Sequence, residues 1–144
     1  MGMVYAPARK AFYWGHQGGG AFCQETTRIT PITVRNVPDR GAVAVASASH
    51  LDPATAKWLS DHQINQTTTI GSSLKFALIA SGQADVYPRF GPTMEWDTAA
   101  GDAILRAAGG MVFHPDGEIY RYGKQYYRNT PFIAYGQSTP PAKV

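Results

Sequence analysis

Short apolar segments separated by turn-forming residues make up the first part of the chain. They occupy residues 3–6, 11–14 and 21–24, and the residues between them, at 7–10 and 15–20, are rich in glycine, proline and polar side chains. Apolar runs of this length with such boundaries are typical of strands. The pattern predicts a β-meander over residues 1–37.

Three consecutive glycines at 18–20 invite a different interpretation, a phosphate-binding loop. Such a loop continues into Gly-Lys-Ser or Gly-Lys-Thr and then a helix, whereas the segment that follows here has the pattern of a strand. Glycine tolerates the positive φ angles of tight turns. We therefore interpret the three glycines as the turn of a hairpin.

From residue 38 onward the pattern alternates between strands and helices. Residues 42–46 are an unbroken run of small apolar residues, which suits a strand buried on both faces. Further strands are expected at 64–70, 85–87, 111–113 and 132–135, with Pro88 closing the second of these. Helices are expected at 54–62, between Ser72 and Gly82, and at 97–108, and the polar residues 120–129 are expected to be a connecting loop.

The expected helix ends carry local signals. Asp52 followed by Pro53 has the order of an N-cap and a first-turn proline. Ser72 can cap the second helix, Gly82 can end it, and the glycines at 109–110 can end the third. This order of elements predicts an α/β fold, a layered α-β-α sandwich in which helices flank a mixed sheet, preceded by the β-meander.

The length of 144 residues suits one domain. We expect it to cover residues 1–137, with the meander at 1–37, the α/β layer at 38–137 and a disordered tail at 138–144. Hydrophobic residues make up 44% of the chain and charged residues 16%, which excludes general disorder. The formal net charge of +3 is too small for a dedicated nucleic-acid binder.

Several other classes of protein are disfavoured. The lone Cys23 cannot form an internal disulfide, and no apolar run reaches the roughly 18 residues that span a bilayer. The first residues lack the features of a signal peptide, so a cytoplasmic location is expected. The four histidines have no zinc-like spacing, and no Gly-x-Ser-x-Gly motif occurs. The aromatic residues occur with apolar strands, which favours a core role over stacking on nucleic-acid bases.

A box of small residues at 96–101, Trp-Asp-Thr-Ala-Ala-Gly, begins the third expected helix. Its carboxylate, Asp97, can cap that helix and complement its dipole, which is worth about 0.5–2 kcal/mol. It can also bind magnesium, because Mg²⁺ is typically held by one or two carboxylates while water and substrate phosphate complete its shell. From spacing alone, capping is the simpler interpretation and metal binding stays open.

Three other places suit an anionic ligand. Ser72 and Lys75 lie at the start of the second expected helix, where free N–H groups attract anions. Arg89 follows a Tyr-Pro pair at a strand end, and its planar guanidinium suits bidentate phosphate binding. His50 follows the buried strand, where open α/β sheets tend to bind ligands. Taken singly, a serine cap, a solvated lysine, a surface arginine and an ordinary loop histidine are the simpler interpretations.

Taken together, these segments resemble the magnesium-dependent, lithium-sensitive phosphatases of the inositol monophosphatase superfamily. The box at 96–101 with the glycines at 109–110 is specific to that superfamily. Lys75, the Tyr-Pro-Arg triplet at 87–89 and the Ser-His-Leu-Asp segment at 49–52 resemble the 3'(2'),5'-bisphosphate nucleotidase branch. The resemblance covers residues 2–135 and implies the C-terminal half of the inositol monophosphatase-like fold.

The resemblance also implies roles for individual residues. Asp97 would bind magnesium beside the substrate and take part in catalysis. His50, Ser72, Lys75 and Arg89 would hold the nucleotide and its non-reacting phosphate. The implied reaction is the hydrolysis of 3'-phosphoadenosine 5'-phosphate to AMP and phosphate, with Mg as cofactor and adenosine 3',5'-bisphosphate or a related small phosphate ester as the molecule bound.

One part of the family pattern is missing. The family's metal cluster needs a Glu from an early acidic helix and two Asp from an Asp-Pro-(Ile/Leu)-Asp-Gly-Thr segment, and none of the ten carboxylates stands in such a motif. The segment from Asp52 to Thr55 lacks the second Asp and the Gly. We therefore expect a C-terminal portion of such an enzyme, inactive alone, that associates with itself or with a complementary N-terminal half.

Other functions stay open at this point. The chain could be a non-catalytic module that binds nucleotides or anions, or half of a split assembly. It could be an inositol or sugar monophosphatase, although a monophosphate would leave Lys75 and Arg89 without a partner. A weak RNA-binding role rests only on the net charge and the basic residues between Arg121 and Arg128.

Overall fold

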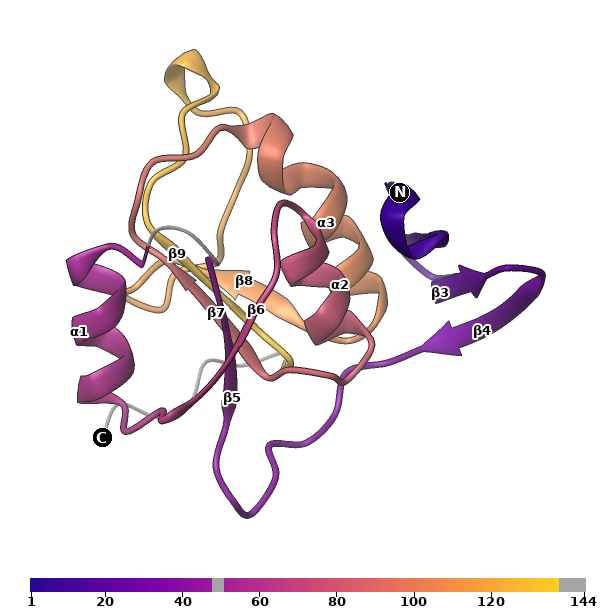
Figure 1. Cartoon of the computed structure of the whole chain (residues 1–144). Coiled ribbons are helices and arrows are strands. Elements are labelled where there is room, and N and C mark those ends of the chain that lie inside the picture. Colours follow the sequence, from indigo (N-terminus) through magenta and orange to yellow (C-terminus); the bar gives the residue numbers. More distant parts are fainter. Residues whose placement is uncertain (48–50, 138–144) are drawn as a thin grey trace.

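A computed structural model describes residues 1–47 and 51–137 of the chain (Figure 1). His50 and the expected tail at 138–144 lie outside these residues, so the predictions made for them stay predictions. The described part contains two sheets and three α-helices, with the chain entering through the smaller sheet. The predicted mixed α/β fold with a preceding meander is confirmed.

The meander is a four-stranded antiparallel sheet in the order β1-β2-β3-β4. Its strands are β1 (Gly2–Ala6), β2 (Ala11–His16), β3 (Gly20–Glu25) and β4 (Arg28–Ile32). The hairpin turn between β2 and β3 is confirmed, since Gly18 and Gly20 both have φ of 80°. The sequence pattern did not predict β4 as a separate strand. Four of its five residues are exposed, so it lacks the apolar signal and is held by backbone pairing with β3.

The second sheet has five strands in the order β6-β5-β7-β9-β8. They are β5 (Val43–Ala46), β6 (Gln66–Thr69), β7 (Val86–Arg89), β8 (Met111–Phe113) and β9 (Phe132–Tyr135). β5 runs parallel to β6 and β7, whereas β9 runs antiparallel to β7 and β8. β5 is interior in this order and its middle residues Ala44 and Val45 are fully buried, as the apolar run at 42–46 predicted.

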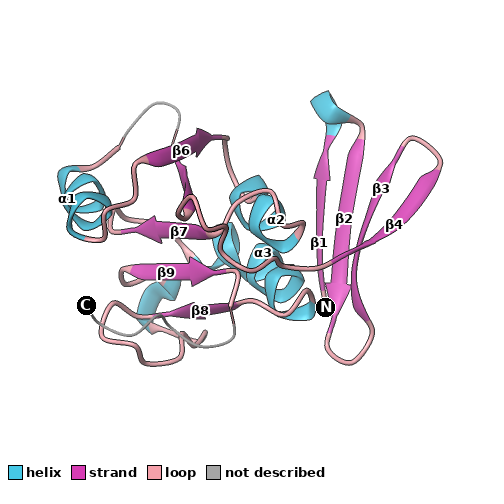
Figure 2. Cartoon of the chain, turned by 90° about the horizontal axis from the view of Figure 1, so that it is seen from below, coloured by secondary structure: helices cyan, strands magenta, loops and turns pink. Residues whose placement is uncertain are grey.

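The helices are α1 (Pro53–Asp61), α2 (Leu74–Ala80) and α3 (Glu95–Ala107), and two single 3-10 turns occur at Pro7–Arg9 and Gln125–Tyr127. Figure 2 shows α2 and α3 between the two sheets and α1 on the other side of the five-stranded sheet. The expected α-β-α layers therefore have the meander stacked on them as an outer layer.

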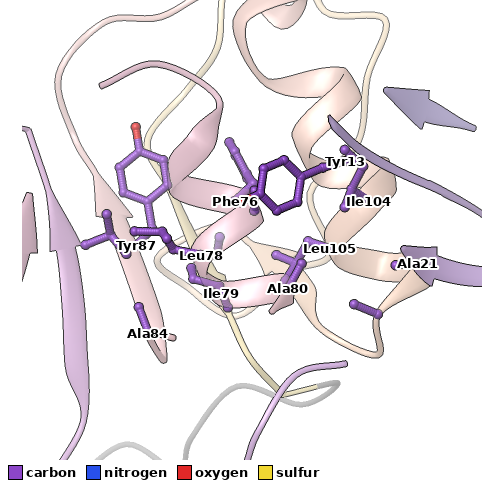
Figure 3. Close-up of a cluster of buried hydrophobic side chains, with 14 of the residues drawn as sticks. Tyr13, Ala21, Phe76, Leu78, Ile79, Ala80, Ala84, Tyr87, Ile104 and Leu105 are labelled. Carbon is purple, nitrogen blue, oxygen red and sulfur yellow. The ribbon is translucent and has the colours of Figure 1, made fainter. Parts of the chain in front are cut away.

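The core lies where α2 and α3 meet both sheets (Figure 3). Because α2 is enclosed from two sides, its residues 75–80 are all buried rather than one face alone. Phe76 packs against Tyr87 with ring centroids 5.5 Å apart and nearly perpendicular planes. A Cβ at Gly101 would lie 2.6 Å from the ring of Phe76, so the small residues of α3 allow close packing on α2.

The predicted N-cap is correct for α1 and wrong for α2. Asp52 is the N-cap of α1: its carboxylate accepts hydrogen bonds from Thr55 N at 2.9 Å and from Thr55 Oγ1 at 2.6 Å. The predicted cap at Ser72 is wrong, because Ser72 has a left-handed φ of 56° and Ser73 stands at the N-cap position without a side-chain cap bond.

Two further predictions need correction. Pro88 does not end its strand, since β7 continues to Arg89 and Pro88 pairs with Ile133 of β9. β5 is paired with β7 only at Ala44–Val86, so the missing N–H of the proline costs no bond to β5. The aromatic residues are also not all core: Trp96 is 67% exposed and Tyr126 is 80% exposed.

Within residues 1–47 and 51–137, no helix is long and apolar enough to cross a membrane.

Candidate functional site

The predicted site residues that the structure describes lie at three neighbouring element ends. Lys75 is in the first turn of α2, Arg89 is the last residue of β7, and Asp97 is in the first turn of α3. Tyr87 of β7 is close enough to all three to contact Lys75 and to respond to the charges of Arg89 and Asp97. The Lys75 ammonium lies 5.4 Å from the centroid of the Tyr87 ring. Burial raises the pKa of Tyr87 to about 12, the positive charge of Arg89 opposes this, and the negative charge of Asp97 adds to it.

Lys75 is almost completely buried, with 6% of its surface exposed. Burial lowers the pKa of its ammonium group, and the nearby charge of Arg89 lowers it further. Its Nζ donates to the carbonyl oxygen of Ser72 at 3.4 Å. No carboxylate in the described part of the chain forms an ion pair with it. A buried ammonium group without a carboxylate partner is stabilised by an anionic ligand.

Arg89 is held by backbone carbonyl groups. Its Nε donates to Gly91 O and its Nη2 to Pro92 O, each at 3.2 Å. Its charge also acts on Asp52: burial alone would raise the pKa of Asp52, but hydrogen bonds from Thr55 and the charge of Arg89 lower it. Because neutral carbonyl oxygens do not neutralise a guanidinium, Arg89 keeps its charge available to a phosphate.

The two serines at the start of α2 have different positions. Ser72 is exposed, and its carbonyl group accepts from both the backbone N–H and the Nζ of Lys75. The hydroxyl of Ser73 donates to the carbonyl oxygen of Asp97 at 3.2 Å. Ser73 therefore joins the first turns of α2 and α3, a contact that no sequence pattern predicts.

Asp97 is the third residue of α3 and is exposed. Its Oδ2 accepts a hydrogen bond from Met94 N at 2.9 Å, so Asp97 does cap the helix, but from its third position, because α3 begins two residues earlier than predicted and Met94 is the N-cap. Its Oδ1 accepts no hydrogen bond from residues 1–47 or 51–137, which leaves one hard oxygen ligand free. This fits a single ligand position of Mg²⁺, an ion that keeps several waters and substrate oxygens in its shell. Among the described residues no three Asp, Glu, His or Cys side chains converge to complete a cluster.

A second carboxylate of α3, that of Glu95, was not predicted as a site residue. Glu95 is buried and accepts hydrogen bonds from Lys124 and Gly123 in the loop that follows β8. These bonds, with that from the Lys124 side chain the strongest influence, hold the pKa of Glu95 at about 2. An acidic residue in the first turn of a helix was the available signal, and its partner, 29 positions further along, could not be identified without the fold.

The arrangement brings together groups whose chemistry suits a phosphate ester. Two cations without carboxylate ion-pair partners in the described residues, Lys75 and Arg89, adjoin one carboxylate, Asp97, with an oxygen free for a metal ion. The comparison with known protein families agrees with this chemistry. The profile of the Inositol monophosphatase family matches residues 1–140. The chain belongs to the inositol monophosphatase family.

Relatives within the family lie close in sequence. The protein is 46% identical over 122 residues to the 3'(2'),5'-bisphosphate nucleotidase CysQ of Salmonella typhimurium, a match that covers 85% of this chain and 48% of that protein. It is 44% identical to the protein of the same name from Escherichia coli K12, with the same coverage. The crystal structure of CysQ from Bacteroides thetaiotaomicron superposes with a TM-score of 0.82 at 37% identity, covering 92% of this chain and 56% of that one. This member of the inositol monophosphatase family thus spans about half the length of the curated relatives it matches.

Proposed function

We propose that this chain provides the substrate-binding side of a magnesium-dependent 3'(2'),5'-bisphosphate nucleotidase, which hydrolyses 3'-phosphoadenosine 5'-phosphate to AMP and phosphate. The observation that carries the proposal is that two cations lie next to Asp97. One is the buried Lys75, and the other is Arg89, which donates to backbone carbonyl groups. A substrate with two phosphates needs a metal ligand at the reacting group and separate cations at the other. The names of the relatives in Salmonella and Escherichia support the same substrate class.

In this proposal each residue has a separate task. Lys75 and Arg89 bind the non-reacting phosphate, and Ser72 and His50 contribute to holding the nucleotide. Asp97 orients the reacting phosphate and is the one carboxylate here that would hold Mg²⁺. A bound Mg²⁺ ion supplies Lewis acidity toward the phosphate and makes a bound water more acidic. The Tyr87 ring positions the Lys75 ammonium by covering one side of it.

Binding to the 144-residue chain tests the proposal directly. Titration calorimetry with adenosine 3',5'-bisphosphate should show binding that Arg89→Ala and Lys75→Met each weaken by about tenfold or more, the loss expected for a charged hydrogen bond. Arg9→Ala and Lys57→Met remove exposed cations away from the site and serve as matched controls. Equal affinity in all four variants would refute the assignment of the phosphate site.

We further propose that the chain alone does not turn over substrate, because Asp97 by itself cannot assemble a cluster of several metal ions. An assay with Mg²⁺ and 3'-phosphoadenosine 5'-phosphate should then give no phosphate release. Adding the half of a relative that this chain does not match should restore release if the two halves complement each other. Robust turnover by the chain alone would contradict this part of the proposal and leave the substrate assignment standing.

A binding module without catalysis is the second candidate, and the lack of a converging ligand cluster in residues 1–47 and 51–137 favours it. Calorimetry with and without Mg²⁺ separates the two: Mg-independent binding that is lost in Arg89→Ala indicates a binding module. Competition between inositol monophosphate and the bisphosphate nucleotide tests a role as an inositol or sugar phosphatase. Self-association, the complementary half and the cytoplasmic location stay predictions.

A further inference from the structure

We propose that residues 120–129 form a brace that fixes the first turn of α3, and that Glu95, Lys124 and Asn129 are positioning residues for the Asp97 carboxylate. The proposal rests on the proposed function only where it gives Asp97 a metal ion to bind. In the sequence this segment reads as no more than a polar connection. The structure attaches it to the start of α3 chiefly through Glu95 and Asn129, and the Tyr122 hydroxyl adds a hydrogen bond to Thr98 Oγ1 at 3.4 Å.

The first attachment is the carboxylate of Glu95. Its Oε1 accepts from Gly123 N at 2.9 Å, from Lys124 N at 3.0 Å and from Lys124 Nζ at 2.8 Å, and its Oε2 accepts from Gly123 N at 3.1 Å. Glu95 is 7% exposed. A buried carboxylate that is satisfied by one short segment requires that segment to stay in place.

Lys124 is enclosed on its other sides by aromatic rings. Its Nζ lies 4.2 Å from the centroid of the Tyr120 ring and 5.0 Å from that of Tyr122. It also donates to the carbonyl oxygen of Arg121. The ammonium is therefore held in one position, and its loss would leave Glu95 buried beside the N-terminal turn of α3 without its charged partner.

The second attachment is Asn129, which is 8% exposed. Its Nδ2 lies 2.8 Å from Met94 O and within 3.1 Å of the hydroxyls of Thr93 and Thr98, and its backbone N–H donates to Thr93 O at 2.9 Å. These contacts enclose the residues just before α3 and its first turn. Together with the buried ring of Tyr120, they hold the loop in a fixed place.

Met94 carries the effect of the brace to Asp97. Its carbonyl oxygen accepts from Asn129 Nδ2, and its backbone N–H donates to Asp97 Oδ2 at 2.9 Å. Asp97 N in turn donates to Met94 O at 3.0 Å. The peptide groups that orient the Asp97 carboxylate are thus held on one side by Asn129 and on the other by the helix turn that Glu95 anchors.

Two residues of the same loop have an unfavourable backbone conformation, which indicates that other contacts hold the loop in place. Tyr126 and Tyr127 have φ of 56° and 55°, in the left-handed region that residues other than glycine rarely adopt. Both side chains are exposed, so their own burial does not explain the conformation. The contacts of Glu95, Lys124 and Asn129 stabilise this conformation, together with the buried ring of Tyr120 and the hydrogen bond from the Tyr122 hydroxyl to Thr98 Oγ1.

Amide hydrogen exchange at Met94 tests the brace without any metal ion. In the full 144-residue chain, Asn129→Ala, Glu95→Gln and Lys124→Met should each speed exchange of the Met94 amide by about tenfold relative to the core amide of Val45, and Asp97→Ala gives the reference for complete loss of that bond. Lys124→Arg should retain slow exchange. Asp61→Asn breaks an exposed ion pair and should change nothing. Normalising to Val45 separates local loosening from general instability, and unchanged exchange at Met94 in all three variants overturns the proposal.

A second measurement links the brace to metal binding. Mn²⁺ should broaden the amide signals around Asp97 in the unmodified chain and lose this effect in Asp97→Asn, and the brace variants should need about tenfold more Mn²⁺ for the same broadening. Faster Met94 exchange without any Mn²⁺ effect in the unmodified chain would support the brace and refute the metal role in the proposed function. A Mn²⁺ effect that persists undiminished in the brace variants would refute the positioning role.

Discussion

The Lys75 ammonium lies 5.4 Å from the centroid of the Tyr87 ring, and the same nitrogen donates to Ser72 O. Burial lowers its pKa below the ordinary value of 10.5, and Arg89 lowers it further. A phosphate dianion beside Lys75 would favour the ammonium form and so raise its pKa against both effects. Binding of the bisphosphate is therefore expected to be coupled to proton uptake by Lys75 at alkaline pH.

The sign of this coupling differs between affinity and stability. As the pH rises toward 10.5, Lys75 loses its proton in the free folded chain first, so affinity for the bisphosphate should fall. The free energy of unfolding should rise over the same range, because the unfolded chain still binds that proton. Calorimetry and urea denaturation at several pH values measure the two trends. Lys75→Met should remove the Lys75 part of both, and trends that persist in that variant would exclude Lys75 as the cause.

A partly buried ion pair, with the Arg35 side chain 30% exposed and that of Asp85 2% exposed, connects the approach to β5 with the start of β7. Asp85 accepts from Arg35 Nε and Nη2, each at 2.8 Å, and from Val43 N at 2.7 Å. Asp85→Asn should lower the free energy of unfolding by about 1–3 kcal/mol, since it weakens the charged hydrogen bonds of Asp85 while Arg35 stays partly solvated. Asp61→Asn, which breaks the exposed pair with Lys57, should change it by less than about 1 kcal/mol. Urea denaturation of both variants gives the comparison, and similar losses would contradict it.

The contact between α2 and α3 depends on Gly101. A Cβ there would lie 2.6 Å from Phe76 Cδ2, and Phe76 is 1% exposed and cannot move aside. Gly101→Ala should lower the free energy of unfolding by about 1–3 kcal/mol through overpacking, despite the better helix propensity of alanine. Gly71→Ala is the control, because no atom lies within 4 Å of a Cβ at that position. A melting temperature unchanged by Gly101→Ala would show that the helices can move apart.

The fold could be predicted as far as local signals reached. The Asp52-Pro53 cap, the apolar run at 42–46 and the glycine ends of α2 and α3 all have short-range physical causes, and the structure confirms them. β4 could not be predicted, because its side chains are exposed and its stability comes from pairing with β3. Ser72 was wrongly read as a cap because nothing in a Ser-Ser pair indicates which residue adopts a left-handed φ.

The candidate site was selected through the family resemblance of its segments, because the chemistry of each residue alone favours a simpler role, and the roles of its residues stay predictions. Lys75, Arg89 and Asp97 were chosen from the sequence, and the structure places them at neighbouring element ends around Tyr87. The roles of Glu95 and Asn129 were not predicted, because their partners lie about 30 positions away in the sequence. Contacts of this kind depend on the path of the loop after β8, and no periodicity in the loop reports that path.

The geometry of Arg89 predicts that bisphosphate binding depends on the planar shape of its guanidinium as well as on its charge. Its guanidinium donates to Gly91 O and Pro92 O at 3.2 Å each, and these two bonds fix the plane in which its remaining donors face a ligand. Lysine retains the charge but cannot make the same pair of bonds or a bidentate contact with phosphate. Arg89→Lys should therefore weaken bisphosphate binding by about tenfold while leaving its dependence on salt nearly unchanged, whereas Arg89→Ala should reduce both. Calorimetry at two ionic strengths distinguishes the variants. If Arg89→Lys binds as tightly as the unmodified chain, the positive charge alone accounts for the role of this position.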